Sequence, residues 1–247
     1  MGTSVGSSIT PTGFDSAAAA LRYWERRQEV VANNLANVNT DGFKGERAFS
    51  HLLAGNSTAT IGTSTDLRAG TMTPTGQPLD VAIDGDGFFV VRTPAGERLS
   101  RGGTLRVDDL RRLVDPAGHL LLGETNDADG ATGAIMIPSD AGKIEISGDG
   151  TVSADGHAIA RLRVERPVAG ATLTHAGDTL FAASGTASVA LDARGVRQGT
   201  REESNVHPLT ALVDMIDVQR AFSTVQKALS TLDSARGIAV TELGKPV

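Results

Sequence analysis

The feature that most restricts the fold of this chain is a pair of apolar stripes with helical spacing, one near each end of the sequence. From Phe14 to Val38 the stripe positions alternate by three and four, the period of a coiled-coil helix. After Glu203 a broader apolar face returns with the period of an amphipathic helix. Water would penalise either stripe if it were exposed, so we expect each to pack against the other or against a neighbouring subunit. The stripe positions are Phe14, Ala17, Leu21, Trp24, Gln28, Val31, Leu35 and Val38, and then Leu209, Leu212, Met215, Ile216, Phe222, Val225, Leu229 and Leu232.

The middle of the chain has a different period. Apolar and polar residues alternate over 79–83 and again over 144–147, which predicts half-buried strands. Turn sequences rich in Asp and Gly recur between such segments, and no helical stretch there is long enough for a parallel crossover. The sequence therefore predicts an α+β fold: an antiparallel, mainly-β central domain, with N- and C-terminal coiled-coil-like helices packed together. The expected divisions are 1–50 for the N-terminal helix, 51–78 for an extended connector, 79–199 for the β-rich domain and 200–247 for the C-terminal helix.

Composition narrows the classes of function. The chain has 247 residues, a formal net charge of −6 and no cysteine. An acidic balance without a Lys/Arg run argues against nucleic-acid partners and anionic membrane surfaces, and the missing cysteine removes disulfides and thiolate chemistry together. No apolar run approaches the roughly 20 residues of a membrane helix, and residues 1–12 lack the apolar centre of a secretory signal. We therefore expect no direct membrane insertion, and export, if it occurs, by a route without a cleavable signal.

Candidate catalytic and metal-binding residues are better explained as turns. Asp84 and Asp86 flank Gly85, and this permissive backbone suits a bend between strands more than a carboxylate pair. Residues 126–130 look like part of a calcium loop, but Pro138 stands where such a loop requires a bidentate Glu. The five His residues are scattered without the spacing of a zinc site. We therefore predict no cofactor, no metal and no catalytic residue.

The most distinctive segment is residues 32–44, at the Asn-rich end of the first stripe. Four Asn within seven residues are unfavourable in a helix, because their amides compete for backbone hydrogen bonds. One explanation is a fraying helix end on the surface. The other is that Asn33 and Asn37, one turn apart, bond polar groups of a facing helix and fix its register. Gly42 suits the left-handed conformation that closes a helix.

Four segments together resemble the flagellar rod and hook protein family. Residues 32–44 look like the family's N-terminal signature, and residues 78–89 look like its central motif. Residues 113–123 are similar to the repeat that follows, and residues 204–222 resemble the C-terminal signature. These matches cover both ends and the middle of the chain in the family order. The short connector and the total length look most like the proximal rod subunit, with a distal rod or hook-related subunit as the alternative.

The resemblance implies a structural role without catalysis. It implies a subunit of the bacterial flagellar basal-body rod, periplasmic and exported by the flagellar type III apparatus. Such a subunit would associate with itself and with other rod and hook-family subunits into a helical drive shaft for motility, its terminal helices forming an inner layer. A soluble β-rich binding module or hydrolase, whose helices merely form an intramolecular hairpin, is the alternative from a different class. The expected assembly-interface residues are Leu21, Trp24, Val31, Leu35, Leu212, Met215, Phe222 and Leu229 in the stripes, with Asn33, Asn37, Gln219 and Arg220 as polar residues that set the register.

Overall fold

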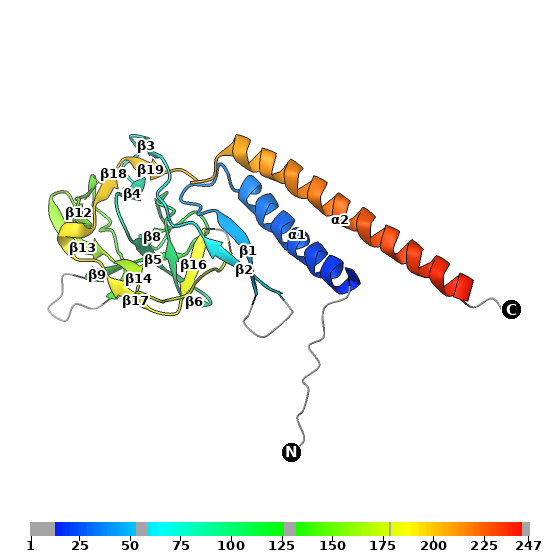
Figure 1. Cartoon of the computed structure of the whole chain (residues 1–247). Coiled ribbons are helices and arrows are strands. Elements are labelled where there is room, and N and C mark those ends of the chain that lie inside the picture. The colour runs from blue at the N-terminus through cyan, green and yellow to red at the C-terminus, as the bar shows by residue number, and fades with distance from the viewer. Residues whose placement is uncertain (1–12, 53–58, 126–131, 178, 244–247) are drawn as a thin grey trace, which may run out of the picture. The chain divides into compact units, whose positions relative to one another are not determined.

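The chain folds into two compact units, each assembled from separate stretches of sequence (Figure 1). The helical unit takes residues 1–36, 46–64 and 208–247, and the β unit takes residues 37–45 and 65–207. The chain therefore passes between the units four times, after residues 36, 45, 64 and 207. The computed structural model describes residues 13–52, 59–125, 132–177 and 179–243.

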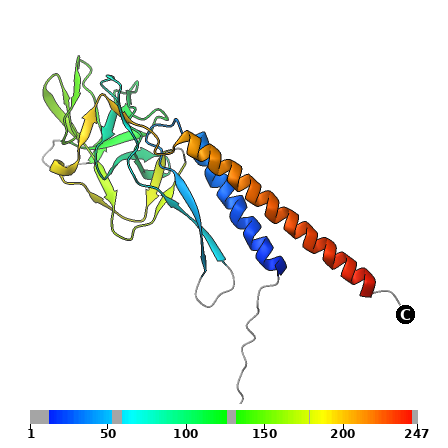
Figure 2. The same cartoon turned by 45° about the horizontal axis from the view of Figure 1, so that its top comes forward.

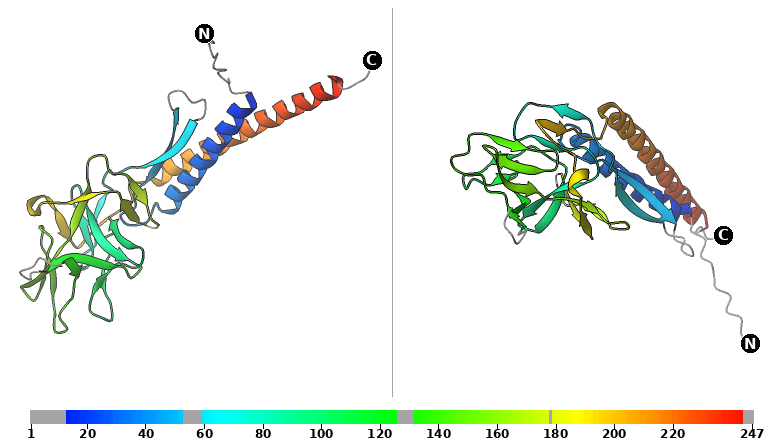
Figure 3. Two further views of the ribbon diagram at one scale, coloured as in Figure 1. Left: turned by 90° about the horizontal axis from the view of Figure 1, so that it is seen from below. Right: turned by 90° about the vertical axis from the view of Figure 1, so that its left-hand side faces the viewer.

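The helical unit contains two helices and a β-hairpin. Helices α1 (Gly13–Ala36) and α2 (Pro208–Leu243) lie side by side and run in opposite directions (Figure 2). Strands β1 (Glu46–Leu52) and β2 (Ala59–Thr65) form a two-stranded sheet, and β1 lies against α1. Helix α2 has 36 residues and α1 has 24, so α2 continues past the start of α1 (Figure 3).

The segment after α1 departs from the expectation of one helix through Val38. Helix α1 ends at Ala36, and the chain then turns, with the Thr40 amide donating to the Asn37 carbonyl at 3.1 Å. Gly42 adopts the predicted left-handed conformation with φ of 70°, but within this turn and not at the helix end. A Cβ on Gly42 would lie 2.4 Å from the carbonyl carbon of Arg101, so the close approach also requires glycine.

Nineteen strands and one short helical turn are described along the chain, and all but two of these strands lie mainly in the β unit. In chain order they are β3 (Met72–Pro74), β4 (Val81–Ile83), β5 (Phe88–Thr93), β6 (Gly96–Ser100), β7 (Arg106–Val107), β8 (Leu113–Val114), β9 (Leu120–Thr125), β10 (Thr132–Ala134), β11 (Ile144–Ile146), β12 (Thr151–Ala154), β13 (His157–Leu162), β14 (Val164–Pro167), β15 (Leu173–His175), β16 (Leu180–Ala183), β17 (Thr186–Ser188), the 3-10 turn η1 (Leu191–Ala193), β18 (Val196–Gln198) and β19 (Thr200–Glu202).

The strands of the β unit form one large sheet and two small ones. The main path of the large sheet is β11-β12-β13-β9-β5-β6-β16-β15, with β14 beside β5 and with β8 and β10 beside β9. The small sheets are β18 with β4 and β19 with β3. Every pair whose register is described is antiparallel. This confirms the α+β class with an antiparallel β core and two terminal helices.

The core of the β unit lies on both faces of β5. Phe89 and Val91 join a large apolar cluster, while Phe88 and Val90 point into a second cluster around Phe181. The prediction of a half-buried strand holds for β11, where an exposed Glu145 separates two covered isoleucines. It is wrong for β4, whose three residues are all buried, because the loop at Gly103 lies directly against the backbone of this strand.

Candidate functional site

One side of α2 is covered at heptad spacing. Val218 has no exposed surface, and Ala211 is 5% exposed. Half-buried residues continue this side of the helix at intervals of three and four positions. Because α2 lies against α1, this heptad side is the side that faces α1. Its members are Ala211, Met215, Val218, Phe222, Val225 and Leu229.

The predicted stripe residues of α1 are also covered. Val31 is buried, and Leu21, Trp24 and Leu35 are half-buried. Trp24 contacts the Tyr23 ring edge-on, with the ring centroids 5.3 Å apart. These four residues, together with Met215, Phe222 and Leu229 on α2, are the predicted apolar positions that the helix pair shields from water.

Leu212 lies elsewhere, in a second line of apolar residues on α2. This apolar stripe, Leu209, Leu212, Val213 and Ile216, runs along the first turns of the helix and is 43–74% exposed. Residues spaced by three and four share one face, so the four side chains form a continuous patch instead of scattered positions. Contiguous exposed apolar surface is a common feature of surfaces that bind another protein.

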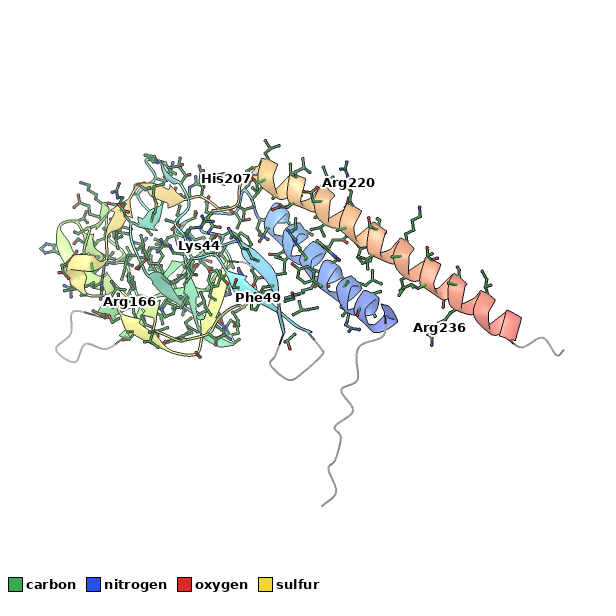
Figure 4. The ribbon with its side chains drawn as sticks, viewed as in Figure 1. Lys44, Phe49, Arg166, His207, Arg220 and Arg236 are labelled. Atoms are coloured by element: carbon green, nitrogen blue, oxygen red, sulfur yellow. The ribbon has the colours of Figure 1, made fainter. Side chains whose placement is uncertain are left out.

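The polar residues expected to set the register occupy different surroundings. Asn33, Gln219 and Arg220 are exposed, and Figure 4 shows Arg220 on the side of α2 away from α1. Asn37 belongs to the β unit, where its side-chain oxygen accepts a hydrogen bond from the Thr40 hydroxyl at 3.2 Å. Their role in assembly stays a prediction.

Asn34, which lies between the two predicted Asn residues, makes the contact that sequence reasoning missed. Its Nδ2 donates to the Glu46 carbonyl at 2.8 Å, and its Oδ1 accepts from the Glu46 amide at 2.9 Å. The amide thus bonds the first residue of β1 as a paired strand would, which fixes where the hairpin starts beside α1. The two hydrogen bonds to the Glu46 backbone offset the low helix propensity of Asn34.

A buried polar node lies in the β unit, where the segments around Gly42 and Thr200 meet. Glu202 pairs with Lys44 at 2.5 Å and with Arg101 at 2.7 Å, and all three side chains are at most 4% exposed. A second N–H of the Lys44 ammonium donates to the Arg68 carbonyl at 2.7 Å, and Glu202 also accepts from the Gly70 amide at 2.9 Å. Figure 4 shows Lys44 within the β unit.

Electrostatics in the node are unbalanced, because two cations share one carboxylate. Arg101 spreads its charge over the carbonyls of Ile83, Gly85 and Gly87, which face it from the β4–β5 connection. Burial lowers the pKa of the Lys44 ammonium from its ordinary 10.5, and the Glu202 partner opposes that shift. A charge kept this deep needs every one of these partners.

Asn205 completes the node, which we define as Lys44, Arg101, Glu202 and Asn205. Its Oδ1 accepts from the Gly45 amide at 2.8 Å, and its Nδ2 donates to the carbonyls of Asp66 and Arg68 at 2.8 and 3.0 Å. Lys44 and Asn205 lie within the two terminal family signatures, residues 32–44 and 204–222, but the sequence predicted no role for either. Lys44 and Glu202 stand 158 positions apart, so no local pattern reveals their pairing.

The described residues contain no group of three or more His, Cys, Asp or Glu placed to hold a metal ion, and residues 126–130 lie outside them. Residues 1–12 lie outside them as well. Asp84 pairs with Arg197 at the surface, and Gly85 and Gly87 both have positive φ, as expected of a bend between strands. No helix in the described part of the chain is both long and apolar enough to cross a bilayer.

Comparison with known families gives three matches in chain order. Residues 14–44 match the flagella basal body rod protein family, and residues 82–154 match the D1 domain of the flagellar hook protein FlgE/F/G family. Residues 197–241 match the C-terminal region of the flagellar basal body rod FlgEFG proteins. The first and third matches contain α1 and most of α2, and the ends of these same matches hold Lys44, Glu202 and Asn205.

Individual relatives align over nearly the whole chain. The flagellar basal-body rod protein FlgF of Caulobacter vibrioides is 33% identical, over 89% of this chain and 93% of its own length. FlgF of Escherichia coli is 32% identical over 86% and 90%, and FlgG of Bacillus subtilis is 30% identical over 88% and 94%. The chain therefore belongs to the family of flagellar basal-body rod proteins.

Proposed function

We propose that this chain is a structural subunit of the rod of the bacterial flagellar basal body, without catalytic activity, and that it helps to carry torque for motility. The observation that supports this role best is the exposed apolar stripe on α2 in a chain of this family. Monomeric proteins rarely expose a contiguous patch of aliphatic side chains, because its contact with water is unfavourable. A subunit of a packed shaft would bury these four side chains against its neighbours.

The helix pair would form an inner, coiled-coil-like layer of a tubular assembly, and the β unit would form an outer layer. A contact between two different surfaces of identical or related subunits generates a helical filament when its rotation does not close into a ring. This geometry suits a shaft built from this chain and from other rod and hook-family subunits. In this proposal the four divisions expected from the sequence correspond to these two layers and the segments that connect them.

The predicted interface residues would divide into three groups. Leu21, Trp24, Val31, Leu35, Met215, Phe222 and Leu229 would hold the helix pair together within one subunit. Leu212 and the exposed Asn33, Gln219 and Arg220 would contact neighbouring subunits, while Asn37 would act within the β unit. We place the subunit in the proximal part of the rod, reached through the flagellar type III apparatus, with a distal or hook-related position as the alternative.

The first test is to purify intact hook–basal bodies from the native cell. We expect mass spectrometry to find this chain in them, and antibody labelling to place it in the membrane-proximal rod. Label nearer the hook would retain the structural role and overturn the proximal position. Absence from the purified particles would overturn the rod assignment itself.

A further inference from the structure

Three of the four passages between the units are tied together by one side chain. Asn205 lies two residues before the last passage, which follows residue 207. Its Oδ1 holds the amide of Gly45, the residue directly before the second passage, at 2.8 Å. Its Nδ2 holds the carbonyl of Asp66, two residues beyond the third passage, at 2.8 Å. The three chain segments therefore meet at a single amide.

Backbone hydrogen bonds join the same segments. The Asp66 amide donates to the Gly45 carbonyl at 2.7 Å, and the Asn205 amide donates to the Phe43 carbonyl at 3.3 Å. The turn that follows the first passage is held as well, because the Gly42 amide donates to the Glu202 carbonyl at 2.7 Å. All four passages thus enter or leave the β unit through segments that bond one another.

The buried ions continue this path into the interior of the β unit. Glu202 lies three residues from Asn205 and pairs with Arg101, which in turn bonds the carbonyls of Ile83 and Gly85 beyond the end of β4. Each of these contacts is buried or partly buried, so water cannot readily replace one partner. The segments at the passages are therefore anchored to the core strands and not to a surface loop.

We infer that the node anchors the chain at its passages to the β unit under load, a coupling role in which Asn205 holds three of the passages in place; this inference rests on the proposed function in carrying torque. Force applied to the helical unit reaches the β unit through the covalent passages. Force that arrives through α2 would pull residues 200–207 away from the rest of the β unit unless non-covalent contacts resist it. Asn205 is the first node residue on that route, because it is the one closest to the last passage.

Single-molecule pulling on the full chain tests this role. The sequence has no cysteine, so Thr210→Cys at the start of α2 and Ser188→Cys in β17 provide two unique, exposed attachment points. Adding Asn205→Ala should make the first rupture at constant force about tenfold faster, since it deletes three side-chain hydrogen bonds at the site that is loaded first. Asn205→Asp keeps the acceptor for Gly45 but turns a carboxylate oxygen toward the Asp66 and Arg68 carbonyls, so it should accelerate the first rupture at least as much as alanine.

Gln198→Ala is the matched control. Gln198 is also an amide with three side-chain hydrogen bonds inside the β unit, to Ile146, Pro78 and Ile144, but these bonds join no passage. We expect it to leave the first rupture unchanged. Equal acceleration by both alanine variants, or no acceleration by Asn205→Ala and Asn205→Asp, would overturn the coupling role. The isolated chain suffices for this measurement, so its result is independent of whether the chain is found in purified basal bodies.

Discussion

At the residue scale, the node holds two buried cations and one buried carboxylate, so its three charges contribute unequally to stability. Glu202 faces both Lys44 and Arg101, and each cation has additional carbonyl partners. Without Lys44, the carboxylate and Arg101 remain as a balanced pair. Without the carboxylate, two buried cations face each other. The stability of these three buried charges therefore depends far more on Glu202 than on Lys44.

We accordingly predict that Glu202→Gln lowers the free energy of unfolding by about 3–5 kcal/mol, the usual result of leaving buried charge uncompensated. Lys44→Met should cost less, about 1–3 kcal/mol, because it removes one of the two side-chain donors to the Arg68 carbonyl but leaves the Glu202–Arg101 ion pair intact. Urea unfolding followed by circular dichroism measures both. Lys143→Met, which removes a surface ion pair with Glu145, is the control and should change stability by less than about 0.5 kcal/mol. Equal losses for the two node variants would contradict the charge argument.

At the element scale, α2 has two apolar faces that differ in their exposure to solvent. The heptad side is shielded by α1, and the apolar stripe is left to solvent. Phe222 represents the first face and Leu212 the second, although both belong to one predicted set of contact residues. The structure thus separates the side of α2 that α1 covers from an exposed apolar side, which we propose contacts a neighbouring subunit.

A charge placed on each face should have opposite consequences. Phe222→Asp should separate α2 from α1 in the free monomer, at a cost of about 3 kcal/mol or more, because it places a carboxylate where a half-buried ring was. Hydrogen exchange should then accelerate in both helices and stay unchanged in the β unit. Leu212→Asp should leave monomer exchange as in the wild type and reduce incorporation into basal bodies.

The exposed Gln226→Asp on the same helix is the control for both variants and should affect neither measurement. Normal incorporation of the Leu212→Asp chain would show that the apolar stripe is not an assembly contact. Loss of β-sheet exchange protection in Phe222→Asp would mean that the helix pair is required for the β unit to fold.

At the scale of the whole molecule, the helix pair covers only part of α2. Residues 230–238 are all exposed, and they lie where α2 has continued past the start of α1 (Figure 3). An unsupported end of a helix opens locally at low free energy. Residues within the pair must first lose their packing before a protease can extend them.

Of the trypsin sites in the two helices, we therefore expect Arg236 to be cut before Arg26 in α1. The two helices pair within one chain, so Arg26 becomes accessible only when the pair opens. Mass spectrometry of the fragments over time gives the order of the two cuts. Simultaneous cleavage at both sites would indicate that the pair is open in solution.

Local periodicity predicted the apolar stripe of α1, in which Leu21, Trp24, Val31 and Leu35 are covered. On α2 it was less reliable: the predicted stripe positions Leu209, Leu212, Ile216 and Leu232 are exposed, and the two most buried residues, Ala211 and Val218, were not among them. The start of α2 is apolar on two adjacent sides, and the small Ala211 gives little sign that its side is the buried one. The role of Leu212 in assembly stays a prediction.

A specific hydrogen bond from an Asn side chain is one of the two explanations for the Asn-rich segment, and Asn34 makes such bonds. Its partner is the backbone of Glu46, which comes next to α1 only after the chain has turned into β1.

The node was beyond the reach of sequence reasoning for a different cause. Arg101 and Glu202 are 101 positions apart, and a lone charged residue in a strand or loop carries no sign of its partner. Their burial becomes visible when the antiparallel sheet is assembled around them. The family signatures contain Lys44 and Asn205 but do not state why these residue types stand there.

The small sheet of β3 with β19 brings the Thr75 amide to the Gly199 carbonyl at 2.7 Å. Residues 76–198 therefore leave and rejoin the rest of the chain at adjacent points. Insertions or deletions in the loops of this segment can change its size without altering the helices, provided that Arg101 and its carbonyl partners in the node are retained. The same pair of terminal helices can thus carry central segments of many sizes.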